Sequence, residues 1–147
     1  MPAVLPKLVE SAFHGLVRHA RWMGRVPILP LFLDTVAQAV IAVGDPVRLR
    51  AMRTVEKSVA TWPGVTCGLH RFGGVEFRGN GREFAHLHGC GLLDVRLGAA
   101  AAAAAIRAGN CEPHHVLGVG AWVSVWVRSE SQVPGVMDLL RIAAQRC

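Results

Sequence analysis

The stretch GVEFRGNGREFAHLHG, residues 74–89, decides the fold of the second half of the chain. Its Asn80-Gly81 pair tolerates the positive φ that a tight hairpin turn requires. Short segments with a period of two, separated by glycines, lie on both sides of this turn. We therefore predict consecutive strands at residues 65–72, 74–77, 82–88 and 92–97.

The register of this hairpin follows from the charges beside the turn. A two-residue turn would pair Phe77 with Phe84 and Arg78 with Glu83, which is favourable on both faces. A three-residue turn would instead set Arg78 opposite Arg82, a like-charge pair. The first register is therefore predicted.

That register assigns side chains to the two faces of the sheet. Because side chains alternate along a strand, Phe84, His86 and His88 should share one face. Glu76 should then lie on the opposite face, away from the two histidines. The H-x-H pair is thus predicted to border a partly apolar pocket lined by Phe84.

The rest of the chain predicts an α+β domain. Its sheet is mostly antiparallel with helices packed on one side, preceded by a helical N-terminal extension. The break TWPG divides a helical part, residues 1–61, from the α+β part, residues 62–147. Helices are predicted at 5–24, 34–43, 46–61 and 99–105 and from Ser131 onwards, with a further strand at 121–127.

The apolar segment at residues 26–44 approaches the length of a membrane span. Two prolines stand at its start and Asp34 falls near its middle, where a carboxylate is costly in lipid. We predict a helix capped by Asp34 that is buried in the fold or lies on a membrane surface.

Charge and cysteine content indicate which partners and which cellular compartment to expect. The formal net charge is +6, but the 14 arginines and two lysines are spread along the chain, so specific nucleic-acid recognition is not expected. The four cysteines never form a C-x-x-C pair. Reduced thiols in a cytoplasmic protein, free or associated with a membrane, are the expectation.

Histidines and carboxylates in the second half could provide a chemical site. They comprise the pair His86/His88, the pair His114/His115, and the acids Glu76, Glu83 and Glu112. An H-x-H strand supplies two metal ligands, but no cysteine cluster or complete cupin motif accompanies it. A protein without a stoichiometric metal ion is therefore predicted.

Four motifs resemble, in order and spacing, the small luciferase-like domain shared by fungal luciferases and many other proteins. They are RFGGVEF (71–77), REFAHLHG (82–89), AGNCEPHHV (108–116) and GAWVSVWVRSESQVPGVMDLLRIA (120–143). The resemblance implies an α+β domain and, for the fungal members, oxidation of a hydroxylated styryl-pyrone by O2 without an organic cofactor. Its motif positions here are Glu76, Glu83, His86, His88, His114, His115 and Trp122.

Three functions remain open from the sequence. The first is a cofactor-independent oxygenase acting on a small acidic, pyrone-like aromatic ring, with His86 or His88 as base. Phe84 and Trp122 would then form the apolar wall and Arg71 would be an anion partner. The second is a non-catalytic module that binds a small molecule, a membrane or a partner protein. The third is a metal-dependent enzyme with H-x-H ligands.

Overall fold

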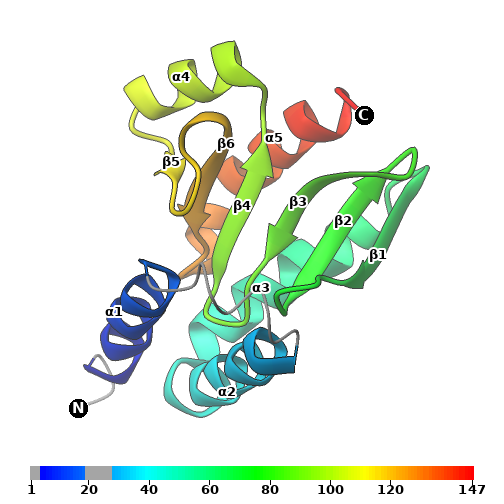
Figure 1. Ribbon diagram of the computed structural model, residues 1–147. Helices are drawn as coiled ribbons and strands as arrows, with labels where there is room; N and C mark the ends of the chain where they lie inside the picture. Colours follow the sequence, from blue (N-terminus) through cyan, green and yellow to red (C-terminus); the bar gives the residue numbers. More distant parts are fainter. Residues whose placement is uncertain (1–3, 19–27) are drawn as a thin grey trace.

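The computed structural model describes residues 4–18 and 28–147 and contains helices and strands in the order expected of an α+β domain (Figure 1). The predicted continuation of the first helix to residue 24, and residues 26–27, lie outside the described residues. The elements are α1 (Val4–Arg18), α2 (Ile28–Gly44), α3 (Pro46–Ala60), β1 (Val65–Leu69), β2 (Val75–Gly79), β3 (Arg82–Leu87), β4 (Leu92–Arg96), α4 (Ala99–Arg107), β5 (Glu112–His114), β6 (Gly118–Trp126), the 3-10 turn η2 (Glu130–Gln132) and α5 (Val133–Ala144).

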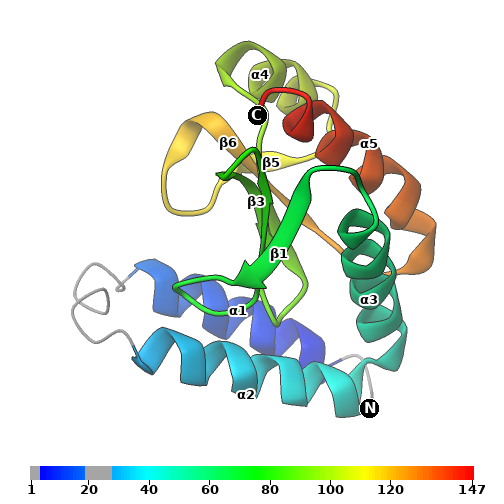
Figure 2. The same cartoon turned by 90° about the vertical axis from the view of Figure 1, so that its right-hand side faces the viewer.

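The six strands form one antiparallel sheet in the order β1-β2-β3-β4-β6-β5. Helices α3 and α5 cover one face of this sheet, and α1 and α2 lie together across one end of it (Figure 2). The predicted α+β class is confirmed. The short strand β5 was not predicted, because Pro113 and the polar residues beside it give no alternating pattern.

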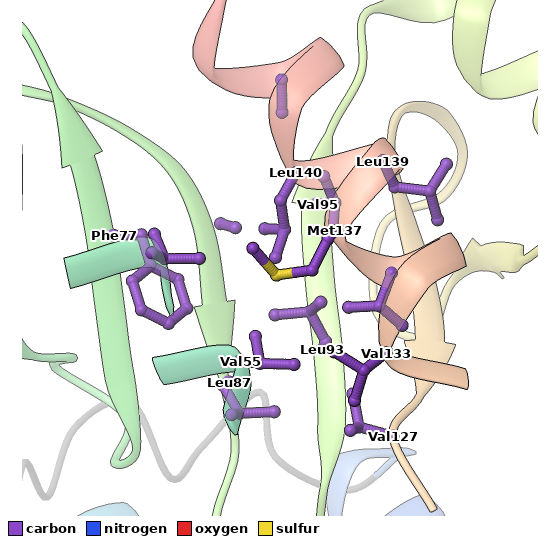
Figure 3. Close-up of a cluster of buried hydrophobic side chains, with 14 of the residues drawn as sticks. Val55, Phe77, Leu87, Leu93, Val95, Val127, Val133, Met137, Leu139 and Leu140 are labelled. Atoms are coloured by element: carbon purple, nitrogen blue, oxygen red, sulfur yellow. The ribbon is translucent and has the colours of Figure 1, made fainter. Parts of the chain in front are cut away.

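The main hydrophobic core lies between the sheet and the helices α3 and α5 (Figure 3). Leu140 of α5 and Val55 of α3 are both 0% exposed and pack with Leu93 and Val95 of β4. Because α3 supplies part of this core, packing continues across the break at residues 61–64. The break marks a change of secondary structure within one hydrophobic core.

The hairpin turn forms as predicted, but a β-bulge changes the strand beyond it. Asn80 and Gly81 both have positive φ, and Arg78 pairs with Glu83. The register then shifts by one residue, so that Phe77 faces Ala85. The extra residue on β3 breaks the alternation of side chains, as bulges do.

Two predictions about this hairpin are therefore wrong. Phe84 turns into the core, where its ring stacks on that of Phe77 at 6.4 Å between centroids, and it does not line the histidine face. Glu76 lies directly opposite His86, so both side chains share one face. The regular alternation of side chains is interrupted by one extra residue in β3. This residue both turns Phe84 into the core and places Glu76 opposite His86.

The apolar helix α2 begins at Ile28, earlier than predicted, and Asp34 lies in its interior. Asp34 is therefore not the N-cap of this helix; its carboxylate accepts a hydrogen bond from the backbone N–H of Gly89 at 2.7 Å. Helices α1 and α2 contact a second apolar cluster that contains Cys90, Leu92 and Trp126. Within residues 4–18 and 28–147, no helix combines the length and the apolar character needed to cross a membrane.

Candidate active site

A row of polar residues crosses the sheet on the face opposite the main core. Asp94 on β4 lies directly opposite His86 on β3 and Ser124 on β6, and Ser124 in turn lies opposite Glu112 on β5. Residues paired in this way project to the same face. The antiparallel order of the strands thus places a carboxylate between a histidine and a serine.

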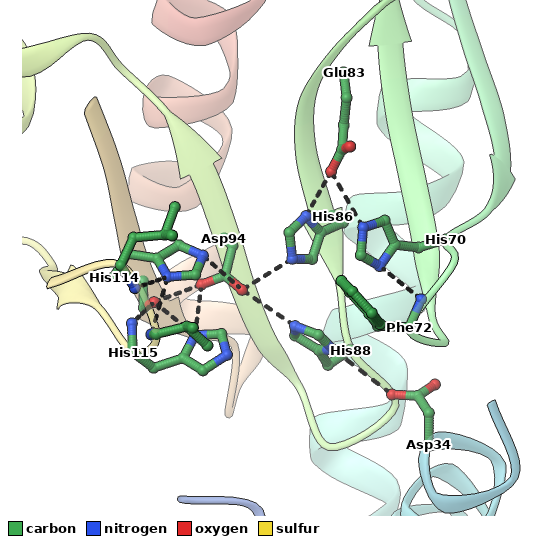
Figure 4. A network of polar contacts seen from close by, with 12 residues as sticks. Asp34, His70, Phe72, Glu83, His86, His88, Asp94, His114 and His115 are labelled. Atoms are coloured by element: carbon green, nitrogen blue, oxygen red, sulfur yellow. Dashed lines mark hydrogen bonds and ion pairs between the residues drawn. The ribbon is translucent and has the colours of Figure 1, made fainter. Parts of the chain in front are cut away.

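Asp94 is 0% exposed and is surrounded by four imidazole rings (Figure 4). Its Oδ2 atom lies 3.0 Å from Nε2 of His86, 3.1 Å from Nε2 of His88 and 3.6 Å from Nε2 of His114. Its Oδ1 atom lies 3.2 Å from Nδ1 of His115. The two histidine pairs, far apart in the sequence, therefore meet at one carboxylate.

The charge of Asp94 is stabilised by these neighbours. Burial raises the pKa of its carboxyl, but hydrogen bonds from the surrounding imidazoles outweigh burial and hold that pKa well below its ordinary value. The Ser124 hydroxyl donates a further, short hydrogen bond to Oδ1. A buried carboxylate is thus kept ionised by nitrogen and oxygen donors.

His86 lies between two carboxylates. Its Nδ1 atom is 2.6 Å from Glu83 Oε1, and its Nε2 atom points to Asp94. Burial alone would lower the pKa of His86, but the hydrogen bonds to Asp94 and Glu83 raise it to about 9. Because both ring nitrogens face carboxylate oxygens, His86 is a buried imidazolium.

His70 and His114 are neutral imidazoles of one tautomer. The Nδ1 atom of His70 accepts the backbone N–H of Phe72 at 3.4 Å, and Nδ1 of His114 accepts those of Val116 and Leu117 at 3.1 Å each. A neutral ring that accepts at Nδ1 carries its proton on Nε2. Burial is the main cause that lowers the pKa of each ring to about 4.

His88 is the most constrained ring of the cluster. Its Nε2 atom faces Asp94, while its buried Nδ1 atom has no hydrogen-bond partner among the described residues. Nδ1 lies 3.8 Å from Oδ1 of Asp34, beyond hydrogen-bond distance. The Phe13 ring of α1 covers this side, with centroids 5.0 Å from His88 and 5.5 Å from His115.

His115 is held by β6 as well as by Asp94. Its backbone N–H donates to Ser124 Oγ at 3.2 Å, and its Nδ1 atom lies 3.3 Å from the same oxygen. Its ring stacks on that of His114 with 4.6 Å between centroids. These contacts aim Nδ1 of His115 into the cluster.

The remaining residues predicted for the site lie at different distances from it. The half-buried Trp122 ring is centred 5.7 Å from His86 and 6.1 Å from His114, so it borders the cluster. Glu76 shares the face but pairs with Arg78 at 3.4 Å. Arg71 is exposed, with its guanidinium 4.5 Å from the ring of Phe72.

Sequence reasoning did not single out three members of the cluster. Asp94 could have been found, because a lone carboxylate in the apolar strand LLDVRL needs a buried partner. His70 stacks on His86 with 4.0 Å between centroids, and its Nε2 lies 3.5 Å from Glu83. Neither His70 nor Asp34 carries a local motif, because each reaches the cluster only through the tertiary fold.

Within residues 4–18 and 28–147, three groups of side chains have ligand atoms close enough together to hold a metal ion. They are His70/Glu83/His86, His86/Asp94/His114 and His88/Asp94/His115. A ligating nitrogen must pass its proton to the other ring nitrogen, but Nδ1 of His70 and Nδ1 of His114 already accept backbone N–H groups and cannot take it. Only the group of His88, Asp94 and His115 therefore fits a metal ion.

The fold and the site together define an antiparallel α+β domain with a buried histidine–aspartate cluster. Residues 81–143 match the family model described as a luciferase domain, and this segment includes Asp94 and all four histidines around it. This segment of the chain is therefore similar to a luciferase domain. Neither the curated proteins nor the solved structures include a match to it.

Proposed function

We propose that this chain is an oxygenase-type oxidoreductase that adds O2 to a small, acidic, conjugated ring compound of the pyrone type, without an organic cofactor. One observation carries the proposal: the luciferase-like segment folds so that His86, an imidazolium held by two carboxylates, lies beside the half-buried Trp122 ring. A protonated imidazole next to an aromatic surface suits a flat conjugated ring compound.

The expected roles of the histidines change with this geometry. The sequence favoured His86 or His88 as base, but His86 already carries both protons and His88 lies beneath Phe13. We assign His86 to proton donation, because its imidazolium is the protonated group beside Trp122. The acidic hydroxyl of the substrate then releases its proton to solvent.

The oxidation step follows from this charge distribution. The electron-rich ring anion transfers two electrons to O2 as a carbon–oxygen bond forms, which leaves a peroxide anion on the ring. His86 donates a proton to that peroxide, and Asp94 and Glu83 stabilise the imidazolium before the transfer. The aromatic wall of Trp122 holds the ring against the histidine that supplies the proton.

Oxygen uptake with a panel of hydroxypyrones tests this function. The parent protein should consume O2 with at least one member, and Asp94→Asn should lower the rate about 100-fold or more, because the histidines lose their anchor. The matched control is Asp138→Asn, an exposed carboxylate of α5 paired with Arg141. Absence of uptake with the whole panel, or equal rates in the two variants, would contradict the proposal.

A binding function that uses α2 is the second candidate. Four large apolar side chains of this helix are exposed: Ile28 by 74%, Phe32 by 63%, Val36 by 43% and Val43 by 87%. Exposed apolar side chains along one helix are typical of a surface that lies on a membrane or a partner. Sedimentation with anionic liposomes tests it: Phe32→Glu should abolish binding, whereas Val119→Ser, at an exposed site outside α2, should not.

A further inference from the structure

We propose that His88, Asp94 and His115 bind one divalent first-row transition-metal ion. The Nε2 atom of His88 lies 3.1 Å from Oδ2 of Asp94, and the Nδ1 atom of His115 lies 3.2 Å from Oδ1. The three ligand atoms all lie within 4.8 Å of one another. Three different strands or loops of the fold thus aim one atom each at a common point.

The spacing of these atoms fits a coordination sphere. Metal–nitrogen and metal–oxygen bonds of about 2.0–2.2 Å place neighbouring ligands about 3 to 3.5 Å apart in octahedral or tetrahedral geometry. The separations of 3.1 Å from His88 to Oδ2 of Asp94 and of 3.2 Å from His115 to its Oδ1 lie in this range, so the carboxylate can offer either oxygen to the ion. An ion can therefore enter with small adjustments of side chains that already converge.

The orphaned nitrogen of His88 provides an independent argument. If Nε2 donates its proton to Asp94, the buried Nδ1 keeps a bare lone pair that points at the Asp34 carboxylate, 3.8 Å away. An ion on Nε2 moves the proton to Nδ1. The N–H then points at the Asp34 carboxylate, as the second ring nitrogen of a metal-bound histidine commonly does.

The number of hydrogen-bond donors around the Asp94 carboxylate also supports a metal ion at this position. An ionised carboxylate offers about four acceptor positions. His86, His88, His115 and Ser124 already approach it within hydrogen-bond distance, and His114 follows at 3.6 Å. A metal ion that takes the lone pairs of His88 and His115 leaves only His86, Ser124 and His114 as donors to Asp94.

Two imidazoles and one carboxylate suit zinc, iron(II), cobalt(II) or manganese(II), and they leave coordination positions for water or another small ligand. This proposal is the opposite of the metal-free protein that the sequence favoured. It also stands apart from the oxygenase proposal. A protein that binds metal but consumes no O2 would contradict the oxygenase function alone.

Metal titration of the chelator-treated full chain tests the site, with Co2+ followed by its visible absorption and Zn2+ by calorimetry. We expect one ion per chain. His88→Ala and Asp94→Asn should each weaken binding by at least about 100-fold, and Asp34→Asn by about 10- to 100-fold as an outer-shell partner. The matched control is His70→Ala, which removes an imidazole that stacks on His86 and lies beside Glu83, and it should leave affinity within about threefold.

Folding is monitored separately by circular dichroism, and His115→Ala replaces any ligand variant that fails to fold. The melting temperature of the parent should rise with Co2+ or Zn2+ concentration, because the ion binds only the folded chain. Less than about 0.2 Co2+ or Zn2+ per chain at saturation would overturn the proposal. Equal loss of affinity in His70→Ala and in the ligand variants would overturn it as well.

Discussion

The carboxylate of Asp34 accepts a hydrogen bond from the backbone N–H of Gly89, 55 residues further along the chain. This bond joins the apolar helix α2 to the loop that follows His88. The contact is close, because a Cβ atom added at Gly89 would lie 2.4 Å from the main-chain oxygen of Asp34. The glycine of the HLHG motif is therefore required by the approach of a helix.

Gly89→Ala should destabilise the protein by about 1 to 3 kcal/mol, because the added methyl group forces α2 away from the loop. Urea unfolding followed by circular dichroism measures the change. The control is Gly135→Ala in α5, where an added Cβ meets nothing within 4 Å. That variant should be neutral or stabilised by up to about 1 kcal/mol, and equal behaviour of the two variants would refute this account of Gly89.

Leu140→Asp should destabilise the domain severely, by about 4 kcal/mol or more, because it buries an unpaired carboxylate in the main core. Thermal melting measures the loss. Ile142→Asp, two residues further along the same helix and 41% exposed, should cost about 1 kcal/mol or less. Similar melting temperatures for the two variants would mean that α5 is not docked as described.

Acid should detach helix α1 before the sheet unfolds. Burial raises the pKa of Glu10, but its bonds to Arg128, at 3.0 Å, and to Arg48, at 2.8 Å, outweigh burial and lower that pKa below its ordinary value. A lowered folded-state pKa means that the bond contributes stability above the unfolded pKa, near 4.5, and loses it as pH falls through the folded value.

Hydrogen exchange of residues 4–18, corrected for the intrinsic effect of pH, should therefore accelerate below about pH 4.5. In Glu10→Gln the exchange should already be faster at pH 7 and should change less on acidification. Exchange in α1 that follows the global unfolding transition in both proteins would rule out a separate detachment step.

The thiol of Cys90 should resist alkylation until the domain opens. It is 0% exposed beneath α1 and α2, and burial raises its pKa to about 12, so almost no reactive thiolate is present at neutral pH. The exposed Cys67 provides the comparison. With a maleimide at pH 7, Cys67 should be labelled first. Labelling of Cys90 at a comparable rate would show that α1 and α2 do not protect it.

Periodicity and turn chemistry predicted most of the sheet. Asn80-Gly81 fixed the hairpin, and Asp45-Pro46 marked the start of α3, where the Asp45 side chain accepts the N–H of Arg48. The bulge at Phe84 could not be predicted. It depends on whether this phenylalanine packs better in the core than on the histidine face, and the core elements come from distant parts of the chain.

The histidines of the site were predicted from the sequence, but the aspartate that they surround was not, because it too depends on contacts between distant parts of the chain. Resemblance of ordered motifs identified His86, His88, His114 and His115, and the structure brings all four together, while their chemical roles stay predictions. Asp94, the residue that unites them, lies in an apolar strand and looks like a lone charge in the sequence. A cross-strand partner becomes visible only when the strand order β3-β4-β6 is known.

Because Asp94 on β4 is the common partner of histidines from both sides of the sheet, the site forms only when β4 is paired with both of its neighbours. The β2–β3 hairpin and the residue after it carry His86 and His88, and the β5–β6 hairpin carries His114 and His115, but neither contains the Asp94 carboxylate that joins them. A fragment or a chimera that lacks β4 would retain histidines without the carboxylate that joins them. Any chemistry that needs all four histidines around Asp94 therefore depends on the pairing of β3, β4, β6 and β5.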